Sequence, residues 1–274
     1  MDEKIIMQGK NYRISDIKEE LKSIQDGKLD GFIKKYDEDT RSGVVKLVDT
    51  AKKRMEKYED ELLRTENLKK YEKQYKDYGY ICGIDEAGRG PLVGPVVAGC
   101  VVFPKGYKND LINDSKKLTE KKREQLYDII IKDAVTYGIG IVSAKEIDEL
   151  NIYEASRKAM IKAYEEANKK VKIDYLLTDA MPIKTLDIPV LKIIKGDAKS
   201  VTIAAASILA KVTRDRILID LDKKYPEYNF KKHKGYPTKE HLEKINEFGV
   251  FDEYRMTYKP VKNVLDRGIV RKKR

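Results

Sequence analysis

An apolar run that ends in two adjacent carboxylates constrains this chain more than any other feature. The run spans residues 80–84, and Asp85, Glu86 and a Gly-Arg-Gly triplet at 88–90 follow it. Neighbouring strand side chains point to opposite faces, so a strand end or bulge is needed to turn both acids toward one ion. The glycines let the backbone approach a ligand closely, and the planar guanidinium of Arg89 can donate two hydrogen bonds to a phosphate. The segment indicates metal-assisted chemistry on a phosphodiester; the plain alternative is a solvated strand end and a glycine turn.

The composition favours a polyanionic partner. The 274 residues carry 57 Lys and Arg against 46 Asp and Glu, a net charge of +11. Such an excess of positive charge favours binding to nucleic acid, although a soluble protein with a generally charged surface can have the same composition. Cys82 and Cys100 lie in apolar runs, where we expect buried, reduced thiols. Two Cys and two His argue against a zinc site and against a Ser-His-Asp triad.

The location of the protein is predicted from what the chain lacks. Its first residues have no apolar signal-peptide core, and no apolar run approaches the ~18 residues of a membrane span. We therefore expect a cytoplasmic protein without membrane contact, and a monomer.

Two kinds of periodicity divide the chain. Residues 1–76 have helical spacing: Ser15 is expected to cap a first helix, a short element covers 29–36, and a long helix covers 43–76. Strand-like runs then occupy 80–84, 92–103, 137–142, 174–178 and 188–194. Helices are expected after the capping residues Thr119, Ser143, Asn151 and Thr238, and another is expected from about Ser200 to Lys223. We predict an α/β fold in two domains, a helical N-terminal extension at 1–72 and a mixed sheet flanked by helices at 73–274.

Four acids lie at or near the ends of these strands. Besides Asp85 and Glu86, Asp179 ends the run 175–179, and Asp197 sits in a Gly-Asp-Ala turn before the helix at 200–223. Ligand sites in such sheets gather at strand ends. Several carboxylates in one place repel each other unless a cation is present, and Mg²⁺ prefers oxygen ligands. Convergence of the four would therefore indicate a metal site.

Each acid also has a structural alternative. Asp179 could cap a turn or helix, and Asp197 could form an Asx turn or an N-cap. Asp215 is a rival for the fourth position, but it lies within the long helix between two arginines. We expect Asp215 to make a surface ion pair or a helix contact.

Taken together, these segments resemble bacterial ribonuclease HII, a type 2 ribonuclease H. The matching strings are DEAGRGP at 85–91, DSKKL at 114–118, KGDA at 195–198, ASILAKV at 206–212 and HKGYPT at 233–238. The resemblance spans roughly residues 78 to 260. The related ribonuclease HIII carries a different Gly-rich signature and another N-terminal domain.

The resemblance implies a ribonuclease H-like fold whose C-terminal helical part covers the substrate. It implies an endonuclease acting on RNA–DNA hybrids and on DNA duplexes with embedded ribonucleotides, which it cuts on the 5′ side to leave 3′-hydroxyl and 5′-phosphate ends. Two Mg²⁺ or Mn²⁺ ions would serve in-line attack by water. Asp85 would bridge both ions, Glu86 and Asp179 would complete one site, and Asp197 the other.

Substrate contacts also follow from the resemblance. The backbone and side chain of Gly88, Arg89 and Gly90 would grip the strand around the scissile site. Ser115, Lys116 and Lys117 would bind phosphate at a helix entry. Tyr236 would stack on the sugar at the DNA–RNA junction, where the 2′-hydroxyl distinguishes RNA from DNA. For Tyr236 the alternative is simple packing.

Other classes of function remain open at this point. A non-catalytic nucleic-acid-binding module would show salt-sensitive binding without cleavage. A phosphoryl-transfer enzyme for a small nucleotide would carry a GxxxxGK[ST] loop, and the sequence has none. A structure-specific DNA nuclease would not depend on the 2′-hydroxyl. The extension at 1–72 is hypothesised to help hold the duplex.

Overall fold

The computed structural model describes residues 12–271. They form two compact units, divided after Asn67. No helix among the described residues is long and apolar enough to span a bilayer.

The first unit is a small helical bundle. Its elements are α2 (Ile14–Ser23), the short 3₁₀ helix η2 (Asp26–Lys28), α3 (Leu29–Tyr36) and α4 (Ser42–Asn67). A buried cluster that includes Ile17, Phe32 and Val48 holds the helices together. The prediction that Ser15 caps the first helix is wrong. Arg13 is the capping position, so Ser15 already lies in the first turn and donates instead to Asp16 at 3.1 Å.

The predicted long helix at 43–76 is also wrong, because it is interrupted after Asn67. Leu68 is buried in the core of the second unit, and its carbonyl accepts a hydrogen bond from the Val201 amide at 2.8 Å. Those two contacts anchor Leu68 in the second unit, and a separate helix, α5 (Lys70–Gln74), follows.

The second unit is built on a five-stranded mixed sheet, which confirms the predicted fold class. Its strand order is β3 (Thr136–Val142), β2 (Val96–Val102), β1 (Ile81–Ala87), β4 (Tyr175–Asp179) and β5 (Val190–Ile193). β2 is antiparallel to β1 and β3, whereas β1, β4 and β5 run parallel. The central strand β1 and its parallel neighbour β4 therefore end at the same edge of the sheet.

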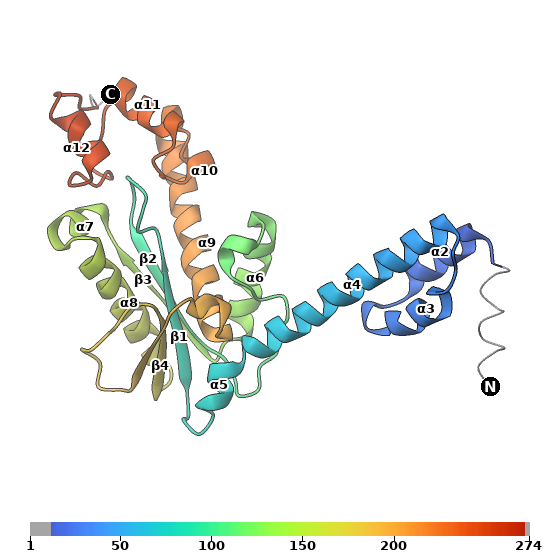
Figure 1. The fold of residues 1–274 in the computed structure, drawn as a ribbon. Helices are drawn as coiled ribbons and strands as arrows, with labels where there is room; N and C mark the ends of the chain where they lie inside the picture. Colours follow the sequence, from blue (N-terminus) through green and yellow to red (C-terminus); the bar gives the residue numbers. More distant parts are fainter. Residues whose placement is uncertain (1–11, 272–274) are drawn as a thin grey trace. The chain divides into compact units, whose positions relative to one another are not determined.

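Helices cover both faces of this sheet (Figure 1). α8 (Ile152–Asn168) packs on one face, while α9 (Val201–Lys224) and α6 (Glu120–Asp133) pack on the other. The approach of α8 is close because β3 has glycines where it passes. A Cβ on Gly138 or Gly140 would lie only 2.0 or 1.9 Å from an α8 carbonyl oxygen.

The C-terminal part is helical, as predicted. It comprises η5 (Pro226–Tyr228), α10 (Phe230–His233), α11 (Lys239–Phe248) and α12 (Lys259–Leu265) around an aromatic core. The remaining short helices are η3 (Ser115–Lys117), α7 (Ala144–Leu150) and η4 (Gly196–Ala198). The predicted caps at Thr119, Ser143, Asn151 and Thr238 are confirmed. The structure adds a cap at Ser200, whose side chain accepts a hydrogen bond from the Ile203 amide.

The first strand extends further than the sequence predicted. Asp85 and Glu86 lie inside β1 rather than after it, because Glu86 and Ala87 still pair with Ala98 and Val97 of β2. Strand alternation then places the two acids on opposite faces. Asp85 shares the α9 face with Gly83, where a Cβ would come within 2.2 Å of the Ile203 amide.

Candidate active site

Three aspartates converge at the shared end of β1 and β4. Asp85, Asp179 and Asp197 each offer a carboxylate oxygen, and these oxygens all lie within 4.8 Å of one another. β1 supplies the first, the last residue of β4 the second, and η4 the third. Asp85 and Asp197 are buried, and Asp179 is half-buried. The fold thus brings Asp85 together with two aspartates that lie more than 90 residues later in the chain.

The backbone around these aspartates is fixed by local contacts. Asp179 Oδ1 accepts a hydrogen bond from the Gly196 amide at 2.8 Å, which ties η4 to the end of β4. Gly196 packs against Ile203 of α9, since a Cβ there would lie 2.6 Å from Ile203 Cδ1. The left-handed Lys195 (φ 56°) turns the chain into η4. Asp197 is thereby held beside Asp179 by backbone geometry.

The electrostatics of this cluster favour a cation. Burial raises the pKa of Asp85 well above its ordinary value, and the charges of Glu86, Asp179 and Asp197 raise it further. Burial also raises the pKa of Asp197, with repulsion from Asp114 and Asp179. For Lys116, burial lowers the pKa, but attraction to Asp197 and Asp85 outweighs it and the pKa is raised. A divalent cation would relieve the repulsion among the carboxylates.

Glu86 lies beside this cluster without joining the three-oxygen group. Its Oε1 lies 3.4 Å from Arg89 Nη1, and its Oε2 is buried with no hydrogen-bond partner among the described residues. Burial raises the pKa of Glu86; attraction to Arg89 opposes this rise and repulsion from Asp179 adds to it. An orphaned buried carboxylate oxygen is costly, and it fits a metal ion or a metal-bound water as its missing partner.

The predicted substrate residues lie on three segments of the second unit. Gly88, Arg89 and Gly90 form the loop after β1, and a Cβ on Gly90 would lie 3.5 Å from the ring of Tyr236. Tyr236 is 43% exposed, so part of its ring is accessible to a substrate. Ser115, Lys116 and Lys117 form η3, whose first turn is capped by Asp114.

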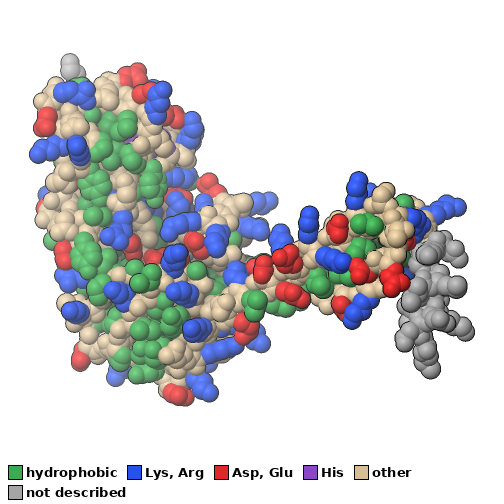
Figure 2. All heavy atoms as spheres, viewed as in Figure 1, with side chains coloured by type: hydrophobic (Ala, Val, Ile, Leu, Met, Phe, Trp, Pro, Cys, Tyr) green, Lys and Arg blue, Asp and Glu red, His purple; other side chains and the backbone are tan. Residues whose placement is uncertain are grey.

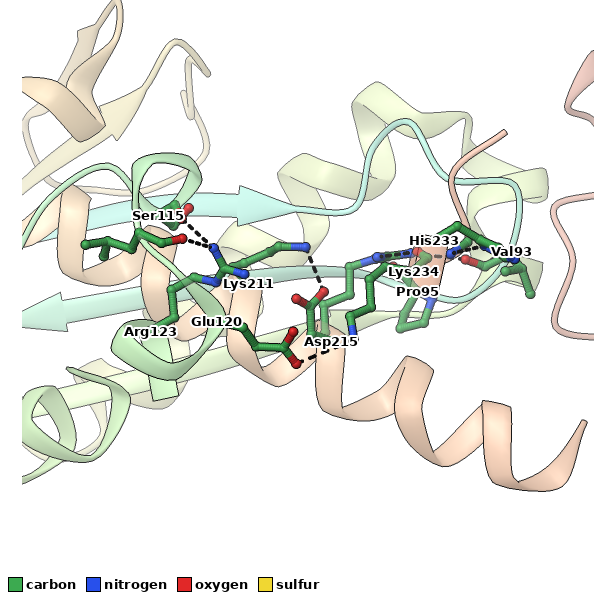
Figure 3. A network of polar contacts seen from close by, with 12 residues as sticks. Val93, Pro95, Ser115, Glu120, Arg123, Lys211, Asp215, His233 and Lys234 are labelled. Carbon is green, nitrogen blue, oxygen red and sulfur yellow. Dashed lines mark hydrogen bonds and ion pairs between the residues drawn. The ribbon is translucent and has the colours of Figure 1, made fainter. Parts of the chain in front are cut away.

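Asp215 does not belong to the group of aspartates. Its Oδ1 accepts a hydrogen bond from Lys211 Nζ, one helical turn earlier on α9, at 2.7 Å (Figure 3). The pair is a helix contact, as expected, but Asp215 is buried rather than at the surface. The sequence did not reveal two other residues at this site, Arg214 and Arg255, which are fully buried behind the 88–90 loop.

Comparison with known proteins identifies the family. The family model of ribonuclease HII matches residues 82–261, and that of the ribonuclease HII N-terminal domain matches residues 13–76. A ribonuclease HII of a Geobacillus strain is 48% identical over 259 residues, which cover 93% of this chain and 91% of the relative. The chain belongs to the ribonuclease HII family. Another member, from Caldanaerobacter subterraneus, is 56% identical over 202 residues, 73% of this chain and 83% of its own.

A solved structure agrees with this assignment. The ribonuclease H2 of Pyrococcus horikoshii superimposes with a TM-score of 0.59 at 29% identity, covering 69% of this chain and 98% of that one. The protein is thus a ribonuclease H, an endoribonuclease that cleaves the RNA of RNA–DNA hybrids. Ribonucleases H depend on metal ions, and the three aspartates are the group that could hold them. Many Lys and Arg side chains lie on the visible face of the second unit (Figure 2), which suits a nucleic-acid substrate.

Proposed function

We propose that this ribonuclease HII hydrolyses the strand at a ribonucleotide by in-line attack of water, with Asp85, Glu86, Asp179 and Asp197 as metal ligands. The observation that supports the proposal best is the convergence of three aspartate oxygens within 4.8 Å of one another. When bound there, two Mg²⁺ or Mn²⁺ ions would activate the water and stabilise the leaving oxygen.

Side chains of the protein are proposed to position the metal ligands and to bind the phosphates of the substrate. The buried carboxylates of Asp85 and Asp197 are fixed before substrate arrives, which removes reorganisation from the reaction. Lys116, drawn toward the same acids, can contact a backbone phosphate next to the scissile one. Arg89 can exchange its weak 3.4 Å contact with Glu86 for a phosphate of the substrate.

Recognition of the ribonucleotide is proposed to come from the loop at 88–90 together with Tyr236. The exposed ring of Tyr236 lies beside Gly90, so a sugar held against the ring would meet this loop. Backbone groups of the loop, together with Tyr236, could read the 2′-hydroxyl, which DNA lacks. From the resemblance to the family, the enzyme is further proposed to cut 5′ of single ribonucleotides in duplex DNA and so to take part in their removal from the genome.

The products of three substrates test this proposal. We expect Mg²⁺- or Mn²⁺-dependent cutting of an RNA–DNA hybrid and of a DNA duplex with one ribonucleotide, with no cutting of the all-DNA duplex. Mapping on sequencing gels should place the cut 5′ of the single ribonucleotide and show 3′-hydroxyl and 5′-phosphate ends. Cutting of the all-DNA duplex would refute recognition of the 2′-hydroxyl, and binding without any cutting would point to a binding module.

The N-terminal extension, residues 1–72, is proposed to help hold the duplex in a monomeric cytoplasmic enzyme. The match of residues 13–76 to the N-terminal domain of the family supports a common role for this segment. A truncated protein whose KM for the hybrid equals that of the full chain would contradict the proposal.

A further inference from the structure

Two arginines of the second unit are buried and have no acidic partner within 4.0 Å among residues 12–271. Arg214 and Arg255 are 1% and 0% exposed. No carboxylate of the described residues lies within 4.0 Å of either guanidinium. A buried charge without compensation is strongly unfavourable. The two guanidinium groups must therefore be satisfied by other groups, and those groups show what the arginines do.

Arg255 donates its hydrogen bonds to the loop that follows β1. Its Nη2 donates to the Gly88 carbonyl at 2.5 Å, and its Nη1 donates to the Arg89 carbonyl at 2.8 Å. Both Nε and Nη2 reach the Gly94 carbonyl, at 3.1 and 3.0 Å. The hydroxyl of Tyr258 donates to the Arg89 carbonyl as well, at 2.9 Å. One guanidinium thus organises the loop that contains the Gly-Arg-Gly triplet.

Arg214 ties the same loop to the segment that carries Tyr236. It donates to the carbonyls of Val93, Pro95 and Lys234 at 3.2, 3.1 and 3.0 Å, three groups that lie close together in Figure 3. Gly88 (φ +97°) rests on this side chain, since a Cβ there would lie 2.2 Å from Arg214 Nε. The two arginines therefore fix the loop from behind.

The direction of the Gly88 and Arg89 carbonyls determines the direction of the N–H groups of Arg89 and Gly90. In a planar trans peptide, the carbonyl and the next N–H point in opposite directions, and the structure has no cis peptide among its described residues. Because the carbonyls of Gly88 and Arg89 face Arg255, the N–H groups of Arg89 and Gly90 face away from the core. Within the described chain, neither N–H has an acceptor. Successive outward amides of this kind form a concave site for an anion.

We propose that Arg255 and Arg214 are positioning residues for the substrate: they hold the Arg89 and Gly90 amides toward a backbone phosphate, and their unneutralised charge strengthens its binding. The inference rests on the proposed function, because it names a nucleic-acid phosphate as the ligand. Burial lowers the pKa of Arg214 to about 10, with repulsion from Arg255, so the group still carries its charge at neutral pH. A charge in a poorly polarisable interior acts on a nearby phosphate more strongly than a solvated one.

Binding to a labelled RNA–DNA hybrid tests this inference, with every protein carrying Asp85→Asn so that the hybrid stays intact. Arg255→Gln and Arg214→Gln should raise the Kd by about tenfold or more and reduce its salt dependence. Arg255→Lys keeps the positive charge but loses the planar set of guanidinium donors. We therefore expect an intermediate Kd whose dependence on salt concentration is unchanged. Arg216→Gln is the matched control: it removes an exposed arginine of α9 that pairs with Glu124, and its Kd should stay within about twofold of the parent.

Several outcomes would overturn the inference. Folded Gln variants whose Kd and salt slope match the parent would do so, and so would an equal loss in Arg216→Gln. Should the Gln variants fail to fold, the amide signals of Arg89 and Gly90 in the parent decide: they must shift when hybrid is added, and unshifted signals refute the inference. A parent that binds no hybrid at all would instead refute the proposed function.

Discussion

Asp85→Asn is expected to lower the rate of hybrid cleavage by about 10³-fold or more at saturating Mg²⁺. Asp85 lies on the central strand, and its carboxylate is the one whose pKa responds to all three other acids. Loss of one metal-binding carboxylate of this cluster is expected to remove several kcal/mol of transition-state stabilisation. Each 1.36 kcal/mol corresponds to a factor of ten in rate. Single-turnover cleavage of a labelled hybrid measures the effect directly.

The loss must not come from unfolding, and the structure predicts the opposite. Removing one charge from mutually repelling buried carboxylates should raise the unfolding temperature of the metal-free protein. Asp215→Asn is the control: it leaves Lys211 without its 2.7 Å partner, so we expect lower stability but cleavage within a few-fold of the unmutated enzyme. Near-normal cleavage by Asp85→Asn would mean that the aspartate cluster is not the catalytic centre.

The second large effect is a loss of stability in acid that originates at His241. This imidazole is fully buried, with Nδ1–H donating to the Tyr236 carbonyl and Nε2 accepting from the Tyr254 hydroxyl, both at 2.9 Å. Burial, helped by repulsion from His233 at a ring distance of 4.2 Å, lowers the pKa of His241 to about 4. Protonation would destroy the acceptor that Tyr254 needs.

The sign of the pH effect follows from linkage. The unfolded chain takes up the proton near the ordinary pKa of 6.5 and the folded chain only near 4, so stability is complete above pH 6.5 and declines as the pH falls. The difference corresponds to about 3 kcal/mol, at 1.36 kcal/mol for each pKa unit. Urea unfolding between pH 7 and pH 4 measures it. His241→Gln should be less stable at pH 7 and lose less on acidification; a decline equal to that of the unmutated protein would contradict the assignment.

The sequence predicted the aspartate cluster because its members follow apolar runs or precede a helix and match the ribonuclease HII strings in order and context. Asp179 ends an apolar strand, and Asp197 precedes a strongly patterned helix with a capping serine. A parallel sheet edge is enough to bring such residues together. The HKGYPT string at 233–238 indicated Tyr236 by its resemblance to the family, although the nearness of Tyr236 to Gly90 needed the tertiary structure.

What the sequence could not predict depends on contacts between distant segments. Periodicity continues through residue 67, so the helix break appears only when Leu68 is seen in the core of the second unit. Strand pairing past Asp85 depends on the register of β2. The position of Arg214 next to Asp215 indicated a surface ion pair. Its partners are instead the carbonyls of Val93, Pro95 and Lys234. Arg255 lies in a short polar stretch with no distinguishing pattern.

Mn²⁺ binding to four single variants tests the central claim most directly, without any need for activity. Isothermal titration and electron paramagnetic resonance should show binding to the unmutated chain, and binding weakened by at least about tenfold in Asp85→Asn, Asp179→Asn and Asp197→Asn. Asp215→Asn, which changes a buried aspartate outside the cluster, should bind as the unmutated chain does. Equal binding by all four variants would contradict the assignment of the metal site to the three converging aspartates.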